Sequence, residues 1–578
     1  PLLQYYAADL KTVDAVGPSA TPSPTAGPTE TPYPFPSVTP LPSYTPNPRT
    51  TPWPTAFPNR LCLPWIAAQA NPPTAPTASP EPPPFAAIPD IDVLDYAVKL
   101  TVPDLVGADI EAHAAVTLRV LAPLDSIDLH VEPEALKVRA VRVGGQAVSH
   151  RVIAGRPNAY GLTGARLRSW PRRPLAAGDT VVLDIDYRLD AAAFSGIRGF
   201  MARQVDGAPF LFTRGLPYYN RYWLPGNDHP SDAATASFDL RVPADTVAAA
   251  NGLLEGGNYL EGSGRDAQGL RRFVWRQGLP IPVYLMAVAI GPFKVHQEEV
   301  CYNPGPDGGT RVDCGGSPEQ RLPLVWYYPG SGTGGFEART LAAIENAADA
   351  VVRFSGLLGP YPFEKLGYVS VPLPYSSEYA SLIAVNYPNG DRDVLHETVH
   401  SWWGDAVRIP HWGDFWIKEG LTSYFSGYWD ELNRGLFGNG AILVNPCDTY
   451  PMRGGPDLEP MDAFITDMRV RRSNAAPYTR GAATVHDLRH RIAALMHRDI
   501  WGPRAKAVWE ALLRGLYTEH RGQTLSTEQL EAYVRANLGW RLAAAGFDVP
   551  PAELTAILDG WAWRWLQAGE KGAGGGPR

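Results

Sequence analysis

The sequence has little cysteine, no long apolar run and no block of basic residues. Four cysteines occur among 578 residues and none forms a Cys-x-x-Cys pair, which argues against a zinc site built from thiolates. The best apolar stretch, residues 283–293, is interrupted by Gly291 and Pro292 and is too short to span a membrane. The net charge is −8, and the scattered Lys and Arg residues give no sign of nucleic-acid binding or of an anionic membrane surface.

The four cysteines leave two questions about disulfide bonds. Cys301 and Cys314 flank a loop rich in Gly and Pro, which favours a local disulfide over two unpaired thiols. Cys62 and Cys447 either pair over a long range or stay free, and the sequence does not decide between these states. The chain begins at Pro1 and not at Met, which leaves room for a signal peptide or an anchor upstream.

Proline and threonine dominate the first part of the chain, from residue 18 to about 84. Proline lacks a backbone N–H and has a fixed φ, so this segment cannot build a packed core. We therefore predict that residues 1–84 form a disordered spacer or stalk, with a short apolar patch at 61–66 that docks on the folded body. Such a stalk predicts an extracellular or cell-surface location, and an intracellular linker is the alternative.

A hydrophobic period of two begins near residue 90 and predicts a β-rich domain over residues 85–296. Short strands with turn residues between them explain this period better than helices do. The alternating apolar residues are Tyr96, Val98, Leu100 and Val102, then Val116, Leu118 and Val120, then Ile127, Leu129 and Val131, then Leu183, Ile185 and Tyr187.

After about residue 336 the period changes toward that of a helix. Leu341, Ile344, Ala348 and Val351 fit one helical face, and a strand-like run over 366–372 follows. Helices are expected over 479–498, 503–517, 526–538 and 551–566. The Gly-rich residues 568–578 are expected to form a frayed tail.

The helix expected over 526–538 carries its own start and stop signals. Ser526 and Gln529 have the spacing of a capping box, which satisfies backbone donors at a helix start. Gly539 is expected to end the helix.

The pentapeptide His-Glu-Thr-Val-His at 396–400 carries the strongest chemical signal. Residues i and i+4 of a helix face the same way, so His396 and His400 can hold one metal ion. Glu419 follows nineteen residues after His400 and can supply a third ligand from a second helix. Two imidazoles and one carboxylate leave one open position on a tetrahedral zinc, as in catalytic sites, and Glu397 lies beside them as a base. The alternative is that His396 and His400 are polar residues with hydrogen-bond partners on a partly buried helix and bind no metal. This alternative gives Glu419 no purpose.

These motifs resemble the aminopeptidase N family of zinc metallopeptidases, the gluzincins, in which His-Glu-x-x-His is followed by a Glu in Trp-x-x-Glu-Gly. The similarity covers about residues 90–567 and includes the segments 210–217, 221–225, 230–235, 282–293 and 360–365. It implies a multidomain fold with a β-sandwich-like, saddle-shaped domain at 85–296. A thermolysin-like α+β catalytic domain at 297–500 and a short helical end at 501–567 would follow. One Zn²⁺ per chain and peptide substrates with a free N-terminus are implied as well.

The resemblance also implies roles for two further residues. Glu378, within 375–379, takes the place of the acid that binds the α-amino group of the substrate. Tyr478 takes the place of the tyrosine that hydrogen-bonds the tetrahedral intermediate. The alternatives are a solvated loop carboxylate for Glu378 and an ordinary loop tyrosine for Tyr478. A second amine-binding acid of the family is missing here, because the corresponding element reads Arg214-Gly-Leu216.

We predict a zinc-dependent aminopeptidase that releases N-terminal residues from peptides by attack of a zinc-activated water. Tyr375 and Ser377 stand where the family has Gly and Met, and this departure, together with the one at 214–216, keeps a zinc endopeptidase of altered specificity open. A non-catalytic binding module on a stalk is a third hypothesis, against which the complete set of ligands, base and tyrosine argues. The sequence does not specify the preferred first residue, the physiological substrate, the oligomeric state or the mode of attachment to the cell.

Overall fold

The computed structural model describes most of the chain from residue 87 to residue 562, and all of it belongs to one unit by its internal contacts. The predicted spacer at 1–84, its patch at 61–66 and the tail at 568–578 lie outside the described residues. The described ranges are 87–155, 163–303, 310–312, 321–330, 335–434, 477–478, 481–497 and 502–562.

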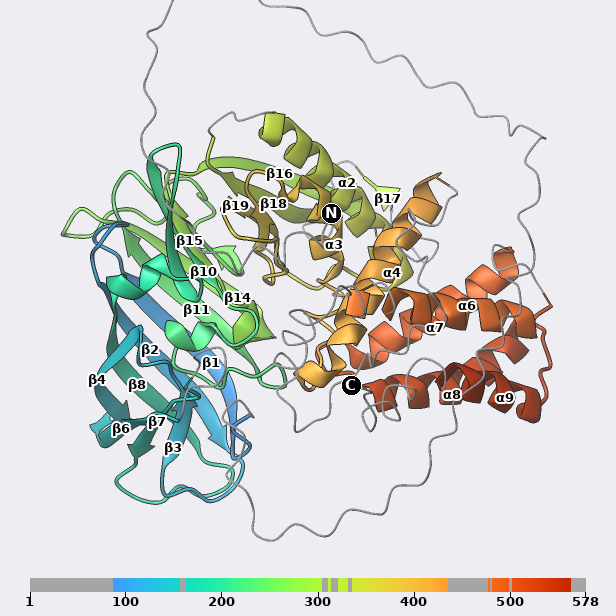
Figure 1. Ribbon diagram of the computed structural model, residues 1–578, viewed down its shortest axis with the longest axis horizontal. Coiled ribbons are helices and arrows are strands. Elements are labelled where there is room, and N and C mark those ends of the chain that lie inside the picture. The colour runs from blue at the N-terminus through green and yellow to red at the C-terminus, as the bar shows by residue number, and fades with distance from the viewer. Residues whose placement is uncertain are drawn as a thin grey trace, which may run out of the picture. The chain divides into compact units, whose positions relative to one another are not determined.

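Three sheets occupy the first part of the described chain, as predicted for a β-rich region (Figure 1). The largest has eight strands, and all its neighbouring pairs are antiparallel except β1 with β11. Its order is β13 (Leu253–Leu254), β14 (Arg271–Pro282), β11 (Ala233–Val242), β1 (Ile91–Thr101), β2 (Ile110–Val120), β8 (Thr180–Leu189), β4 (Leu136–Val143) and β5 (Gln146–Ala147).

Two smaller antiparallel sheets accompany the large one. One has the order β12 (Val247–Ala250), β15 (Val288–Gly291), β10 (Ala208–Arg214) and β9 (Gly199–Val205), and the other has the order β3 (Ile127–His130), β7 (Arg166–Trp170) and β6 (Ser149–Ile153). Strand β10 ends at Arg214, the first residue of the segment 214–216 that corresponds to the second amine-binding acid of the resembled family.

The period of two in the sequence corresponds to one buried face of each strand. Val116, Leu118 and Val120 on β2 are fully buried, while the residues between them are partly or well exposed. The same alternation runs along β11, where Phe238 and Leu240 face the core. Burial of these aliphatic and aromatic side chains supplies the main driving force for this part of the fold.

A fourth sheet carries the site and is mixed. Its order is β17 (Thr310–Arg311), β16 (Lys294–Asn303), β18 (Arg321–Tyr328), β19 (Leu366–Val371) and β20 (Ile383–Asn386), and β18, β19 and β20 run parallel to one another. Every residue of β19 is buried, as is typical of a parallel strand covered on both faces. The strand-like run predicted over 366–372 is thereby confirmed.

Cys301 lies on β16 and is disulfide-bonded. Cys62, Cys314 and Cys447 lie outside the described residues. The predicted pairing of Cys301 with Cys314 therefore stays a prediction.

Helices follow and flank the mixed sheet. On the first of them Ile344, Ala348 and Val351 are buried as predicted, while Leu341 is half-buried. In Figure 1 the last four described helices gather beside the helix that carries Glu419. The α-helices are α2 (Phe336–Leu357), α3 (Val394–Val399), α4 (Phe415–Arg434), α6 (Gly481–Leu495), α7 (Pro503–His520), α8 (Thr527–Ala544) and α9 (Pro551–Trp561). Short 3₁₀ turns lie at Ala191–Ser195, Asn220–Tyr222, Val283–Leu285, Gly390–Arg392 and Trp412–Asp414.

Helix α8 confirms one sequence prediction and corrects another. The capping box of Ser526 and Gln529 is present at its start. Gly539 does not end the helix, which continues to Ala544 and buries Leu542. A Cβ at Gly539 would lie 3.2 Å from Leu554 Cδ2, so this glycine makes room for α9 instead of acting as a stop.

No helix within the described ranges is both long enough and apolar enough to cross a membrane.

Candidate metal centre

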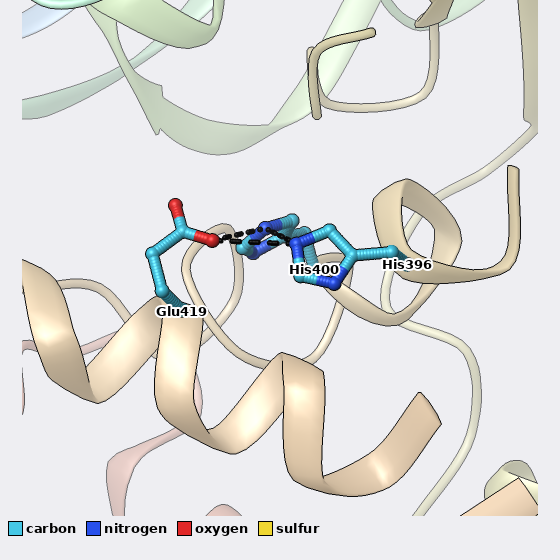
Figure 2. Close-up of side chains that lie close together, drawn as sticks. All are labelled: His396, His400 and Glu419. Carbon is cyan, nitrogen blue, oxygen red and sulfur yellow. Dashed lines mark hydrogen bonds and ion pairs between the residues drawn. The ribbon is translucent and has the colours of Figure 1, made fainter. Parts of the chain in front are cut away.

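The structure brings His396, His400 and Glu419 together as the sequence predicts. His396 and His400 project from α3 and its last turn, and Glu419 projects from α4 (Figure 2). Glu419 Oε2 lies 3.3 Å from each histidine Nε2, and the two Nε2 atoms are 3.2 Å apart. Ligand bonds of about 2.0–2.1 Å in tetrahedral geometry place ligand atoms roughly 3.3 Å apart. The donor set and its spacing therefore fit a zinc ion.

The surroundings of His400 prepare its Nε2 as a ligand. Its Nδ1 lies 2.9 Å from the Trp403 carbonyl oxygen and 3.0 Å from Thr422 Oγ1, so an Nδ1–H has two acceptors and Nε2 keeps its lone pair. Burial, followed by the charge of Lys418, lowers the pKa of His400, which favours the neutral imidazole that binds metals. His396 is the more accessible ligand, with 18% of its side chain exposed against 1% for His400.

We expect Thr422→Val to weaken zinc binding about tenfold, in line with the usual effect of losing a partner of a ligating histidine. The side chain of Thr422 is fully buried, so valine fills the space and removes only the hydroxyl next to His400. Competition with a chromophoric chelator measures the zinc affinity. Thr422→Ser keeps the hydroxyl and is the matched control, expected to bind zinc as the unaltered chain does. Equal affinity of the valine variant would contradict the assigned contact.

Glu397 lies on α3 directly after His396, and only 8% of the residue is exposed. Burial first, and then the charges of Glu378, Asp393 and Glu419, raise the pKa of Glu397 well above the ordinary value. A carboxylate whose pKa lies above the usual range can both accept and return a proton near neutral pH. Its place and environment therefore suit a general base.

Two glycines let the helix of Glu419 approach the helix that follows Tyr478. A Cβ on Gly420 would lie 2.7 Å from Gly481 Cα, and a Cβ on Gly481 would lie 2.6 Å from Gly420 Cα. Helices α4 and α6 thus cross with backbone against backbone. The crossing places the Tyr478 ring 5.9 Å from the His396 ring, between centroids. The structure therefore places the Tyr478 ring beside His396 of the metal cluster, and the role that the resemblance implies for Tyr478 stays a prediction.

The two unusual segments at 214–216 and 375–379 contact each other. Arg214 Nε donates to Tyr375 Oη at 2.8 Å, and the guanidinium carbon lies 4.7 Å from the centroid of the Tyr375 ring. The Gly215 N–H donates to Tyr379 Oη at 3.0 Å. Arg214 and Tyr375, which both depart from the family pattern, therefore contact each other. Leu216, in the place of the missing acid, is half-buried among apolar residues.

Glu378 is not a solvated loop carboxylate, because only 5% of its side chain is exposed. Its Oε1 accepts a hydrogen bond of 2.6 Å from Lys418 Nζ, and its Oε2 accepts one of 3.3 Å from Ser377 Oγ. Burial by itself raises the pKa of Glu378, but Lys418 and then His400 outweigh it and the pKa is lowered. Glu378 is thus held as a carboxylate in the interior.

Lys418, like Thr422, is a residue of the site that the sequence did not single out. Its Nζ also donates to Glu419 Oε1 at 2.6 Å, and its side chain is fully buried. Burial by itself lowers the pKa of Lys418, but Glu378 and Glu419 raise it well above the ordinary value. A signal existed in the sequence: a lysine stands next to a predicted metal ligand, directly after the apolar pair Trp416 and Ile417.

Comparisons with known proteins agree with this geometry. The model of the Peptidase family M1 domain matches residues 387–436, which include α3 and α4. Aminopeptidase B of Mus musculus is 24% identical over 417 residues, which cover 65% of this chain and 56% of the relative. Leukotriene A-4 hydrolase of Xenopus laevis is 25% identical over 356 residues, which cover 60% and 52%. This chain thus spans about half the length of these curated relatives.

A solved structure has the same fold. The M1 zinc metallopeptidase of Deinococcus radiodurans superposes with a TM-score of 0.59 at 24% identity, covering 82% of this chain and 94% of that one. The likeness supports a multidomain fold with a sheet-rich N-terminal part and a helical C-terminal part.

The fold and the cluster place the chain in the class of zinc metallopeptidases with a His-Glu-x-x-His helix. Within that class, residues 387–436 match the Peptidase family M1 domain, and the chain is similar to aminopeptidases and zinc metallopeptidases of this aminopeptidase N-like family of hydrolases. Zinc is the cofactor of this family, and His396, His400 and Glu419 are the residues that would hold it.

Proposed function

We propose that the chain is a zinc-dependent aminopeptidase that removes N-terminal residues from peptides. The observation that carries this proposal is the link between Glu378 and the metal ligands. Glu378 Oε1 and Glu419 Oε1 each lie 2.6 Å from the same ammonium group, that of Lys418. One extended residue spans about 3.3–3.6 Å, so an α-ammonium held at Glu378 leaves the first peptide bond near the metal ligands.

In this proposal each residue has one chemical task. Zinc, when bound, polarises the substrate carbonyl and lowers the pKa of a water. Glu397 accepts a proton from the attacking water and later donates it to the leaving amine. The Tyr478 phenol donates a hydrogen bond to the oxyanion that develops on the carbonyl oxygen. Glu378 accepts a charge-assisted hydrogen bond from the α-ammonium and thereby fixes the first residue.

Comparing a peptide that has a free N-terminus with its N-acetylated twin tests the proposal. We expect kcat/KM to be about 10–100-fold higher for the free amine, because a hydrogen bond to a charged group contributes roughly 1.5–3 kcal/mol. Product analysis by mass spectrometry identifies the bond that is cleaved. Equal cleavage of both peptides would contradict the exopeptidase assignment and leave a peptidase without amine recognition.

A zinc endopeptidase of altered specificity is the second candidate. The observation that favours it is the replacement of the second amine-binding acid by Leu216, together with the contact between Arg214 and Tyr375. Glu378 is then the one carboxylate that the resemblance assigns to the amine. Cleavage in the middle of an N-acetylated peptide would support this candidate.

We also propose the finer architecture that the resemblance implies. The mixed sheet with α3 and α4 supports a thermolysin-like catalytic domain over 297–500. The three sheets before it support a β-sandwich-like, saddle-shaped domain over 85–296. Helices α7, α8 and α9 support a helical end over 501–567.

We propose an extracellular or cell-surface location. The disulfide at Cys301 supports it, because such bonds persist in oxidising compartments. A protease added to intact cells that produce the protein tests this location. Cleavage of the protein would support it, and protection would contradict it.

A further inference from the structure

Lys418 is a buried cation between two carboxylates with different tasks. It lies on α4 between Ile417 and the metal ligand Glu419, and its ammonium stands 4.8 Å from the centroid of the Phe415 ring. Two of its three N–H donors go to Glu378 Oε1 and Glu419 Oε1. No solvent reaches its side chain.

Stability alone is a weak reason for this arrangement. Burying an ion pair costs desolvation energy, and apolar residues of similar size are often equally stabilising. The two hydrogen bonds instead define a geometry. They hold one oxygen of each carboxylate and leave Glu378 Oε2 beside Ser377 Oγ, while Glu419 Oε2 faces the two histidines.

We propose that Lys418 is a positioning residue that fixes the separation between the amine anchor Glu378 and the metal ligand Glu419. This inference rests on the proposed function, because Glu378 is an amine anchor only for a peptidase that binds a free N-terminus. A fixed separation presents the first peptide bond to the metal ligands and keeps later bonds out of register. Lys418 thus contributes to substrate choice without touching the substrate.

Lys418→Met tests this role, because methionine keeps an apolar stem of similar length and removes both hydrogen bonds. Two losses are expected. Zinc affinity, measured by chelator competition, falls about 10–100-fold, as is usual when a partner of a metal ligand is removed. The preference for a free-amine peptide over its N-acetylated twin falls as well, through a higher KM for the free amine and with little change in KM for the acetylated peptide.

A double variant shows whether Lys418 acts through Glu378. We expect Lys418→Met to leave the free-amine preference unchanged when Glu378→Gln is already present, because the anchor is then lost. Independent effects of the two substitutions would overturn the assignment. Such a comparison separates a coupled pair from two separate sites.

Lys365→Met is the matched control. Lys365 is the same residue type and is also fully buried, but its Nζ donates to the Ala250 carbonyl oxygen at 2.9 Å and stands 4.2 Å from the Trp275 ring centroid. Its loss is expected to affect folding stability but neither zinc affinity nor the free-amine preference. If zinc affinity and the free-amine preference change in Lys365→Met as they do in Lys418→Met, general destabilisation explains the effect and the inference fails.

The measurements separate this inference from the proposed function. A folded Lys418→Met variant with unchanged zinc affinity and unchanged preference overturns the inference, and Lys418→Gln provides the same test if the methionine variant does not fold. If the unaltered chain cleaves no peptide, the proposed function fails. Calorimetry with leucine amide and N-acetyl-leucine amide then measures amine preference, and chelator competition still measures the link between Lys418 and Glu419.

Discussion

Glu397→Gln is expected to lower turnover by about 10²–10⁴-fold, the usual contribution of general acid–base catalysis, while zinc stays bound. Glutamine has nearly the shape of glutamate but cannot accept and return a proton. Zinc should stay because the cluster consists of His396, His400 and Glu419, and Glu397 is not part of it. Steady-state hydrolysis of an amino-acid amide, with zinc content measured after gel filtration, checks both parts.

A carboxylate outside the site provides the control for this substitution. Glu364 Oε1 accepts a hydrogen bond of 3.1 Å from the Gly278 N–H, and Glu364→Gln is expected to keep full turnover. Full activity of Glu397→Gln would refute the general-base role. Loss of zinc together with activity would instead give Glu397 a part in metal binding.

The metal cluster could be predicted because its geometry is mostly local. The spacing of His396 and His400 sets both side chains on one face of a helix whatever surrounds it. The prediction of Glu419 as a third ligand also required a second helix alongside the first. The Trp-x-x-Glu-Gly motif indicated this arrangement. Tyr478 followed in the same way from a short motif, and the crossing at Gly420 and Gly481 brings it to the cluster.

What could not be predicted depends on residues far apart in the sequence. A lysine on a helix ordinarily has its charged end in water, and its burial at 418 depends on Glu378, forty positions away, together with the neighbouring Glu419. Arg214 and Tyr375 are separate departures from a motif in the sequence, yet 161 positions apart they form one contact. Glycine often ends a helix, which is why Gly539 was expected to do so. The close approach of Leu554 explains instead why a glycine occupies this position.

Gly481→Ala is expected to destabilise the fold and to impair catalysis, which reverses the usual effect of this change. An alanine in a helix ordinarily stabilises by up to about 1 kcal/mol relative to glycine. Here the new Cβ would lie 2.6 Å from Gly420 Cα, an approach that backbone atoms must move to relieve. Overpacking of this kind typically costs about 1–3 kcal/mol, measured as the free energy of unfolding in denaturant.

Gly560→Ala is the matched control for helix propensity. Gly560 lies in α9, where a new Cβ would meet only the flexible end of Arg491, at 3.1 Å from Nη1. We expect this alanine to be neutral or slightly stabilising. If Gly481→Ala lowers the free energy of unfolding and Gly560→Ala does not, the loss of stability arises from the crossing of α4 and α6.

Gly481→Ala is expected to impair catalysis because the crossing of α4 and α6 positions Glu419 and Tyr478. Gly420 is next to the metal ligand Glu419, and Gly481 begins the helix after Tyr478, so parting the helices moves the phenol away from the cluster. A displacement of about 1 Å can cost roughly 10²-fold in rate, so kcat should fall in Gly481→Ala while zinc content stays full. A folded, zinc-loaded variant with unchanged kcat would show that Tyr478 is not needed in this position.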